Sequence, residues 1–291
     1  MNIKMKDNSK INIIIYIFLI SSISALNGNY NPFLKELIAE AKLKNLKLED
    51  YDLIYEEKCE FLNSEVWTIR QAGPSAWNKH AGLEPQFMET KEDGKFIRLS
   101  CDKTNSNEDG WITSAISTKE FYGDGMFECE ARFKSGKSTW PAIWMVNNHV
   151  SKDNSDYYEI DLSEYYETRD TTTTTYHNPQ SIMGGDPCAK TVSSPIKKGD
   201  WNKFICTWDK NYISVYLNDQ KIFEVPNDGD SSHYPTIEST RFFTIILSMQ
   251  YANKWLSTPD LSELPLYMDI RKLKIYKLKK IFSLVFFEFF S

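Results

Sequence analysis

Three carboxylates lie within six residues, at Glu159, Asp161 and Glu164, and apolar Ile160 and Leu162 separate them. Like charges at this spacing repel one another, so this mixture is not typical of a merely solvated charged surface. Paired carboxylates can hydrolyse a glycosidic bond, because one attacks the anomeric carbon or activates water while the other protonates the departing oxygen. Asp161, between the two glutamates, is suited to hold a proton or hydrogen bond that sets the charge of Glu159.

The period of a β-strand decides whether these acids can meet. On a regular strand Glu159 and Asp161 share one face, whereas Glu164 lies with Ile160 and Leu162 on the other. A β-bulge between Asp161 and Glu164 adds one unpaired residue and returns Glu164 to the face of its partners. At about 3.3 Å per residue the two glutamate backbones still lie roughly 13 Å apart. Retaining glycosidases hold their two carboxyl groups about 5 to 5.5 Å apart, so the side chains must lean toward each other.

The run resembles the E-x-D-x-x-E signature of glycoside hydrolase family 16, in the branch with the bulge rather than the shorter E-x-D-x-E form. Other segments resemble the same family in the same order along the chain, and the match covers residues 51–276. These segments are Trp111–Ala115, Tyr122–Arg132, Thr139–Met145 (similar to the W-P-A-[FI]-W segment of laminarinase-like members), Trp201–Phe204, Trp208–Tyr216 and Tyr267–Tyr276.

The resemblance implies an all-β fold for residues 51–277, a β-jelly-roll sandwich of two antiparallel sheets with a concave substrate groove. Independently, short apolar or alternating runs from Tyr51 onward are separated by turn residues such as Asp93-Gly94 and Gly184-Gly185, which is typical of an all-β sandwich or barrel. The family also implies double displacement with retention. Glu159 is then the nucleophile, Glu164 the general acid and base, and Asp161 the residue that tunes Glu159. No cofactor takes part in this catalysis.

Aromatic residues near the acids are the second group of candidates, because sugar rings stack on indole and phenol rings. Core packing is the alternative for each of them, and for His177 it is a structural or surface role. By resemblance, His177 occupies the place of a histidine that lies near the attacked sugar in many laminarinase-like members. The aromatic candidates are Trp140, Trp144, Tyr157, Tyr158, Tyr165, Tyr166 and Trp255, and for substrate binding we favour Trp140, Trp144, Tyr158 and Trp255 with His177.

Two further acids, Glu60 and Asp269, resemble positions that hold a structural calcium in many members of the family. Hard carboxylate oxygens suit this ion. Ordinary surface acids are the alternative for both.

Residues 1–25 have the three parts of a secretory signal peptide: Lys4, Lys6 and Lys10, then an apolar stretch over 11–20, then small residues up to Ala25. A secreted, extracellular protein is the expectation. Removing this segment takes away three lysines and one aspartate and moves the formal net charge from −6 to about −8. An acidic protein repels nucleic acid and polyanions, which favours a neutral glycan as partner.

Five cysteines allow at most two disulfides. Cys101 and Cys129 alternate in register with apolar neighbours and are interpreted as small core residues. Cys59 and Cys188 lie in less regular sequence and are the better candidates for a bridge.

Two segments differ from the central domain. Residues 26–50 form an N-terminal extension in which Leu34, Leu37, Ile38 and Ala41 recur at helical spacing, which predicts a short amphipathic helix. The tail over 278–291 is rich in phenylalanine but too short for a membrane span of about 20 residues. An extra strand, a lipid-anchor signal and an unreliable end to the gene model remain open for it.

The function we expect is a secreted, monomeric endo-β-glycosidase that hydrolyses β-1,3- or mixed β-1,3/1,4-glucan. The Trp140 to Trp144 segment favours glucan, whereas Ile246 to Trp255 departs from the form common in laminarinases. A galactan-type hydrolase of the agarase or carrageenase kind and a transglycosylase are alternatives. A non-catalytic β-glucan-binding protein is the alternative from another class, and the presence of all three acids argues against it.

Overall fold

The computed structural model describes residues 48–104, 110–148, 151–185, 189–251 and 256–279. The predicted signal peptide, nearly all of the predicted N-terminal extension over 26–50 and all but two residues of the predicted tail lie outside these ranges. Residues Leu48–Asp50 form a short 3-10 helix (η2) that leads directly into the first strand. No helix among the described residues has the length and apolar character needed to cross a membrane.

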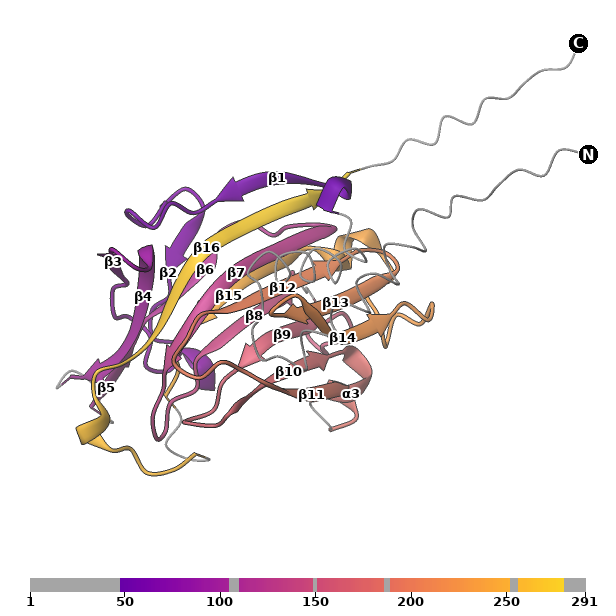
Figure 1. Cartoon of the computed structure of the whole chain (residues 1–291). Coiled ribbons are helices and arrows are strands. Elements are labelled where there is room, and N and C mark those ends of the chain that lie inside the picture. Colours follow the sequence, from indigo (N-terminus) through magenta and orange to yellow (C-terminus); the bar gives the residue numbers. More distant parts are fainter. Residues whose placement is uncertain (1–47, 105–109, 149–150, 186–188, 252–255, 280–291) are drawn as a thin grey trace, which may run out of the picture. The chain divides into compact units, whose positions relative to one another are not determined.

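Two antiparallel sheets make up the domain, as Figure 1 shows. The nine-stranded sheet has the order β14-β13-β12-β7-β16-β4-β3, and β1 pairs with β16 while β5 pairs with β4. Its strands are β1 (Tyr51–Glu56), β3 (Gln86–Thr90), β4 (Gly94–Lys103), β5 (Trp111–Thr113), β7 (Gly125–Lys134), β12 (Asn202–Trp208), β13 (Tyr212–Leu217), β14 (Gln220–Pro226) and β16 (Leu266–Leu278).

The seven-stranded sheet has the order β11-β10-β9-β8-β15-β6-β2. Its strands are β2 (Trp67–Ile69), β6 (Ala115–Thr118), β8 (Ala142–Asn147), β9 (Glu159–Glu164), β10 (Thr171–His177), β11 (Lys190–Pro195) and β15 (Phe243–Ser248). Short helices lie in the connections: η3 (Ala76–Asn78), α3 (Pro179–Met183), η4 (Glu238–Arg241) and η5 (Leu261–Glu263). The predicted two-sheet jelly-roll sandwich is confirmed.

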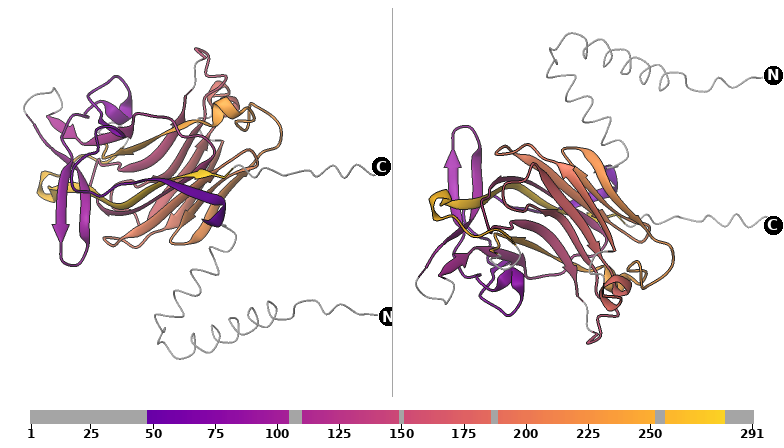
Figure 2. Two further views of the ribbon diagram at one scale, coloured as in Figure 1. Left: turned by 90° about the horizontal axis from the view of Figure 1, so that it is seen from above. Right: turned by 90° about the horizontal axis from the view of Figure 1, so that it is seen from below.

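The core lies between the sheets, which Figure 2 shows as two stacked layers. Strand β7 illustrates why these residues form strands: Phe127, Cys129 and Ala131 are fully buried, whereas the intervening Glu128 and Glu130 are half-buried on the other face. This period of two places apolar side chains inward along each strand. A sandwich with one apolar and one polar face per sheet follows.

The cysteines pack in this core. Cys101, Cys129 and Cys206 are completely buried, which confirms the core role expected for the first two. Cys59 is a free, buried thiol that packs against the same core, so its prediction as a bridge member is wrong. Cys59 faces the core, but the sequence around it has no regular period from which this orientation could be predicted. Cys188 lies outside the described residues.

The two acids predicted to bind calcium are engaged in separate ion pairs. Asp269 on β16 is fully buried, and its carboxylate accepts hydrogen bonds from Arg98 at 2.7 Å and Arg132 at 2.9 Å. Glu60 is exposed and pairs with Lys95. Both Asp269 oxygens therefore have guanidinium partners, and calcium binding by Glu60 and Asp269 stays a prediction.

The buried ion pair generates a stability prediction. Asp269→Ala leaves two arginines without their counter-charge, so the free energy of unfolding should fall by about 3 to 5 kcal/mol. Glu60→Ala is the matched control, because an exposed ion pair contributes little to stability. Urea denaturation followed by tryptophan fluorescence measures both values. Similar losses for the two variants would contradict a stabilising role for the buried pair.

Candidate active site

A bulge in β9 brings the three acids to one face. Along the neighbouring β8, Ile143 pairs with Ser163 and Trp144 with Asp161, so two residues advance on β9 for one on β8. The register with β10 shifts at the same place. Leu162 is buried in the core, and the Ser163 hydroxyl hydrogen-bonds Thr172 at 2.7 Å. The predicted bulge is therefore present between Asp161 and Glu164.

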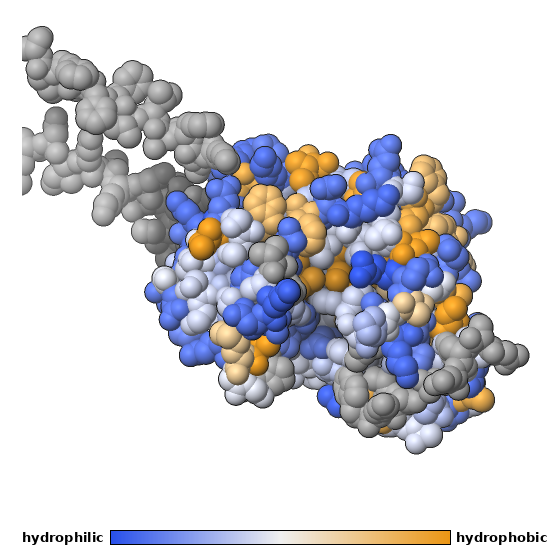
Figure 3. All heavy atoms as spheres, turned by 180° about the vertical axis from the view of Figure 1, so that it is seen from behind, coloured by the Kyte–Doolittle hydropathy of each residue, from blue (hydrophilic) through white to orange (hydrophobic). Residues whose placement is uncertain are grey.

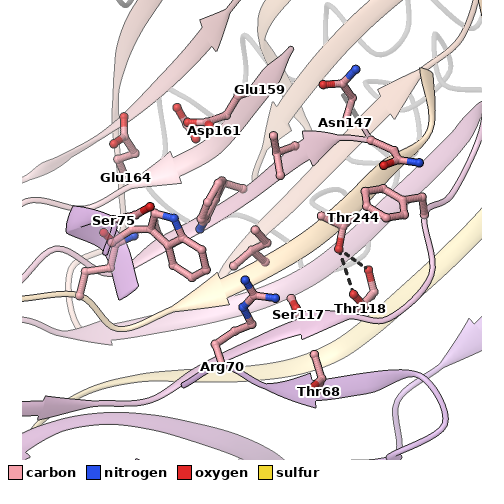
Figure 4. A pocket seen from close by; sticks show the side chains of 18 of the residues that line it. Thr68, Arg70, Ser75, Ser117, Thr118, Asn147, Glu159, Asp161, Glu164 and Thr244 are labelled. Atoms are coloured by element: carbon pink, nitrogen blue, oxygen red, sulfur yellow. Dashed lines mark hydrogen bonds between the residues drawn. The ribbon is translucent and has the colours of Figure 1, made fainter. Parts of the chain in front are cut away.

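All three acids line a groove of about 790 Å³ that crosses five adjacent strands of the seven-stranded sheet: β2, β6, β15, β8 and β9. Its floor is an apolar cluster of Ala142, Trp144 and Ile246, with Trp77 and Val146 packed against it. The surface seen from behind the view of Figure 1 is hollowed where apolar and hydrophilic residues meet (Figure 3). In Figure 4, Glu159, Asp161 and Glu164 lie together on one side, and Arg70, Thr68 and Ser117 lie on the other.

Three donors hold the Glu164 carboxyl group. Trp140 Nε1 donates to Oε1 at 3.1 Å, and the Tyr166 hydroxyl donates to the same oxygen at 2.7 Å. The Thr175 hydroxyl contacts Oε2 at 3.1 Å. Trp140 and Tyr166 also stack, with ring centroids 5.8 Å apart. The orientation of Glu164 is thus set from three sides.

Glu159 and Asp161 share a second set of partners. The Tyr157 hydroxyl donates to Glu159 Oε2. His177 Nε2 lies 2.9 Å from Asp161 Oδ2 and 3.6 Å from Glu159 Oε1. The imidazole therefore bridges the two carboxylates from β10, the neighbouring strand.

Burial dominates the electrostatics of this group. Removal from water, together with the charges of Glu159 and Glu164, raises the pKa of Asp161 well above its ordinary value. Burial also raises the pKa of Glu159, although His177 and the Tyr157 hydroxyl oppose the shift. Tyr157 itself has a raised pKa, because it is buried beside Glu159, and so remains a neutral donor. Asp161 is the carboxyl group best placed to hold a proton.

One cluster of metal-ligating atoms appears among the described residues, and it is this same group. The ligand atoms of Glu159, Asp161 and His177 all lie within 4.8 Å of one another. Such a set could hold a divalent cation. Hydrogen bonding among a protonated Asp161, Glu159 and His177 is a sufficient role for the same three side chains.

Some of the predicted sugar-binding residues line the groove and one does not. Trp140 and Trp144 line the groove, and His177 contacts both Asp161 and Glu159. Tyr158 does not face the groove, so its prediction is wrong. It is 2% exposed and donates its hydroxyl to the Tyr234 carbonyl in the core, because even-numbered side chains before the bulge point inward. Trp255 lies outside the described residues.

Sequence reasoning missed Trp77 and Arg70. Trp77 packs edge-on against Trp144 with ring centroids 4.9 Å apart, and the Arg70 guanidinium lies 5.3 Å from the Trp77 ring. Both residues belong to the irregular stretch that begins at the end of β2, where no strand period indicates a face. The only indication in the sequence that this stretch could bind a sugar is that it contains an arginine and a tryptophan within eight residues.

The chain is similar to known glycoside hydrolases, which agrees with the grouping of three carboxylates in one groove. The model of the family Glycosyl hydrolases family 16 matches residues 80–263. A keratan-sulfate endo-1,4-beta-galactosidase from Sphingobacterium multivorum is 26% identical over 280 residues, covering 90% of this chain and 64% of that protein. A glucan endo-1,3-beta-glucosidase from Cryptopygus antarcticus is 30% identical over 152 residues, covering 45% of this chain and 51% of that protein. The chain thus spans less than two thirds of the length of these relatives.

A solved structure shows the same fold. The laminarinase catalytic domain from Thermotoga maritima aligns with a TM-score of 0.62 and 21% identity, covering 79% of this chain and all of that one.

The raised pKa of Asp161 predicts a gain in stability on neutralising it. A raised native pKa stabilises the fold below the ordinary pKa of the free side chain, and this contribution is lost as the pH rises through the native value. Asp161→Asn should therefore melt several degrees above the wild type at pH 8, with the difference shrinking toward pH 4. Each pKa unit corresponds to about 1.4 kcal/mol.

Thermal unfolding from pH 4 to pH 9 measures this difference. Asp170→Asn is the control, because Asp170 is an exposed aspartate that pairs with Lys198 at the surface. A melting difference for Asp161→Asn that is the same at every pH would contradict the assignment of the proton to Asp161.

Proposed function

Because this chain belongs to glycosyl hydrolases family 16, we propose that it is a secreted endo-β-glycosidase that cleaves a polysaccharide with retention of anomeric configuration. The observation that carries the proposal is the meeting of Glu159, Asp161 and Glu164 in one groove, each with different partners. Secretion rests on the amino-terminal sequence pattern alone.

Glu159 is the nucleophile in this mechanism. Its carboxylate attacks the anomeric carbon, and the bond from that carbon to the leaving oxygen breaks as the glycosyl-enzyme forms. The Tyr157 hydroxyl and His177 lie on the two Glu159 oxygens and orient the attack. As the negative charge of Glu159 is consumed, the hydrogen bonds that it accepts weaken, and the repulsion that helps to raise the pKa of Asp161 is relieved.

Glu164 transfers protons to and from the reacting oxygens. It protonates the leaving oxygen in the first step and removes a proton from water in the second, so water attacks and releases Glu159. An indole N–H can only donate, so Trp140 occupies Oε1 in both protonation states. The proton therefore belongs on Oε2, whose partner Thr175 is a hydroxyl that can also accept.

The form of the groove favours attack within a chain rather than at its end. Its lining residues come from five adjacent strands, which corresponds to about 19 Å at the usual strand spacing. A polysaccharide would lie across the strands, with the Trp140, Trp144 and Trp77 rings along its path.

Two substrate classes are supported by different observations. β-1,3- or mixed β-1,3/1,4-glucan is favoured by the Trp140 to Trp144 segment, and the Cryptopygus antarcticus relative is named for a β-1,3-glucan. A β-galactan is favoured by the relative that matches over 90% of this chain, which is named for keratan sulfate. Transfer to a second sugar instead of water would use the same residues.

Substitution of the two glutamates tests the mechanism. Glu159→Gln and Glu164→Gln should each lose activity by about 10²- to 10⁴-fold while retaining the wild-type fold, because each removes one of the two chemical groups. Initial rates and circular dichroism measure both properties. Wild-type turnover by Glu159→Gln would exclude it as the nucleophile.

The alanine variants distinguish the two roles with an activated aryl glycoside and sodium azide. In Glu159→Ala, azide can displace the leaving group directly and gives the inverted glycosyl azide. In Glu164→Ala, azide attacks the glycosyl-enzyme and gives the retained product. The opposite pattern of products would reverse the two assignments.

A substrate panel tests the class of polysaccharide. Laminarin, mixed-linkage β-glucan, agarose and keratan sulfate are incubated with wild-type protein, and the reducing ends and product sizes are measured. Endo attack predicts early oligosaccharides of mixed length rather than a single short product. Release of monosaccharide alone would contradict an endo mode, and absence of cleavage across the panel would contradict these substrate classes.

A further inference from the structure

Arg70 is a positively charged side chain of the groove with no carboxylate within ion-pair distance among the described residues. Arg70 follows β2 and lies on the wall opposite the three acids, with its guanidinium directed toward the middle of the groove (Figure 4). It stacks over Trp77 and forms no ion pair with a carboxylate in the described part of the chain. By contrast, Arg98, Arg132 and Arg241 are each paired with an aspartate.

A half-buried guanidinium without a counter-charge is energetically unfavourable. Burying a charge without a partner lowers stability, so buried arginines are ordinarily matched. In a chain with a formal net charge of −6, acids to pair with it are in excess. None of the acids that the structure describes forms an ion pair with Arg70, which lines the open groove.

The neighbours of Arg70 suit a bound anion. Thr68 and Ser117, which also line the groove on this side, have hydroxyl groups that can donate. Exposed Lys119 lines the same groove farther along, where its backbone N–H donates to Val66, whereas that of Arg70 donates to Ala115. A planar guanidinium with hydroxyl donors on the same wall is suited to hold a sulfate or carboxylate group.

We propose that Arg70 forms a subsite for an anionic substituent on the polysaccharide, either a sulfate ester or a carboxylate. This inference rests on the proposed function and narrows its substrate class. Arg70 adjoins β2, four strand spacings from β9, so the charged group would belong to a sugar several positions from the bond that is cleaved. The subsite therefore sets which chain binds and does not take part in bond cleavage.

Matched pairs of substrate test the subsite. The pairs are keratan sulfate with its desulfated form and carboxymethylated β-1,3-glucan with the unmodified glucan, and the measured quantity is the ratio of kcat/KM within each pair. Arg70→Gln should reduce the preference for the anionic member by about 10- to 100-fold through KM, because a charge-assisted hydrogen bond is lost. Arg70→Lys should recover part of it. The sulfate and carboxylate pairs show which anion is the ligand.

Lys103→Gln is the matched control, because Lys103 also places a cation over an indole, that of Trp111 at 4.7 Å, but lies on β4 of the other sheet. It should leave the preference as in the wild type. A purely structural role for Arg70 predicts equal losses on both members of a pair. Equal losses, or a wild-type protein with no preference in either pair, would overturn the subsite and leave the proposed function intact.

Direct binding separates failure of the subsite from failure of the proposed function. The Glu159→Gln protein, titrated calorimetrically with the same four polysaccharides, reports binding whether or not any of them is cleaved. Tighter binding of an anionic member that is lost in Glu159→Gln/Arg70→Gln supports the subsite even if catalysis is absent. Equal affinity within both pairs, or no binding, overturns it.

Discussion

Alternation of side chains along β9 constrains the entire site. Ile160 and Leu162 are fully buried between the sheets, and a slip of one residue would move the acids into the core. The core therefore determines that Glu159 and Asp161 face the groove. The bulge then changes the face of Glu164 without disturbing the buried residues. Packing on one side of the sheet and chemistry on the other are decided by the same six residues.

Two buried aspartates show how the fold treats charge in different ways. Asp269 is paired with Arg98 and Arg132, so its negative charge is balanced and its role is structural. Asp161 is surrounded by two glutamates and one histidine, and burial raises its pKa. A group poised to hold or release a proton is destabilising at neutral pH but useful next to a nucleophile. The difference between the two sites is a difference in their partners, not in depth.

The sequence predicted those features that follow from periodicity or from a contiguous motif. The sandwich, the bulge and the grouping of the three acids are of this kind. Tyr158 was assigned to the wrong face although the same alternation, counted back from Ile160, places it in the core. Arg70 and Trp77 could not be predicted, since they reach the groove from an irregular segment across the sheet. The net charge favoured a neutral glycan, but it is a sum over the whole chain and gives no information about the unpaired arginine in the groove.

The central claim, that the bulge presents Glu159 as a nucleophile beside Glu164, is tested most directly by trapping the covalent intermediate. An activated 2-deoxy-2-fluoro oligosaccharide slows both chemical steps, and its good leaving group restores the first, so the glycosyl-enzyme accumulates. Mass spectrometry of the tryptic peptide over residues 153–169, which contains all three acids, then locates the sugar by fragmentation. The account predicts a single adduct on Glu159. An adduct on Glu164 or Asp161, or turnover with inversion and no adduct, would contradict it.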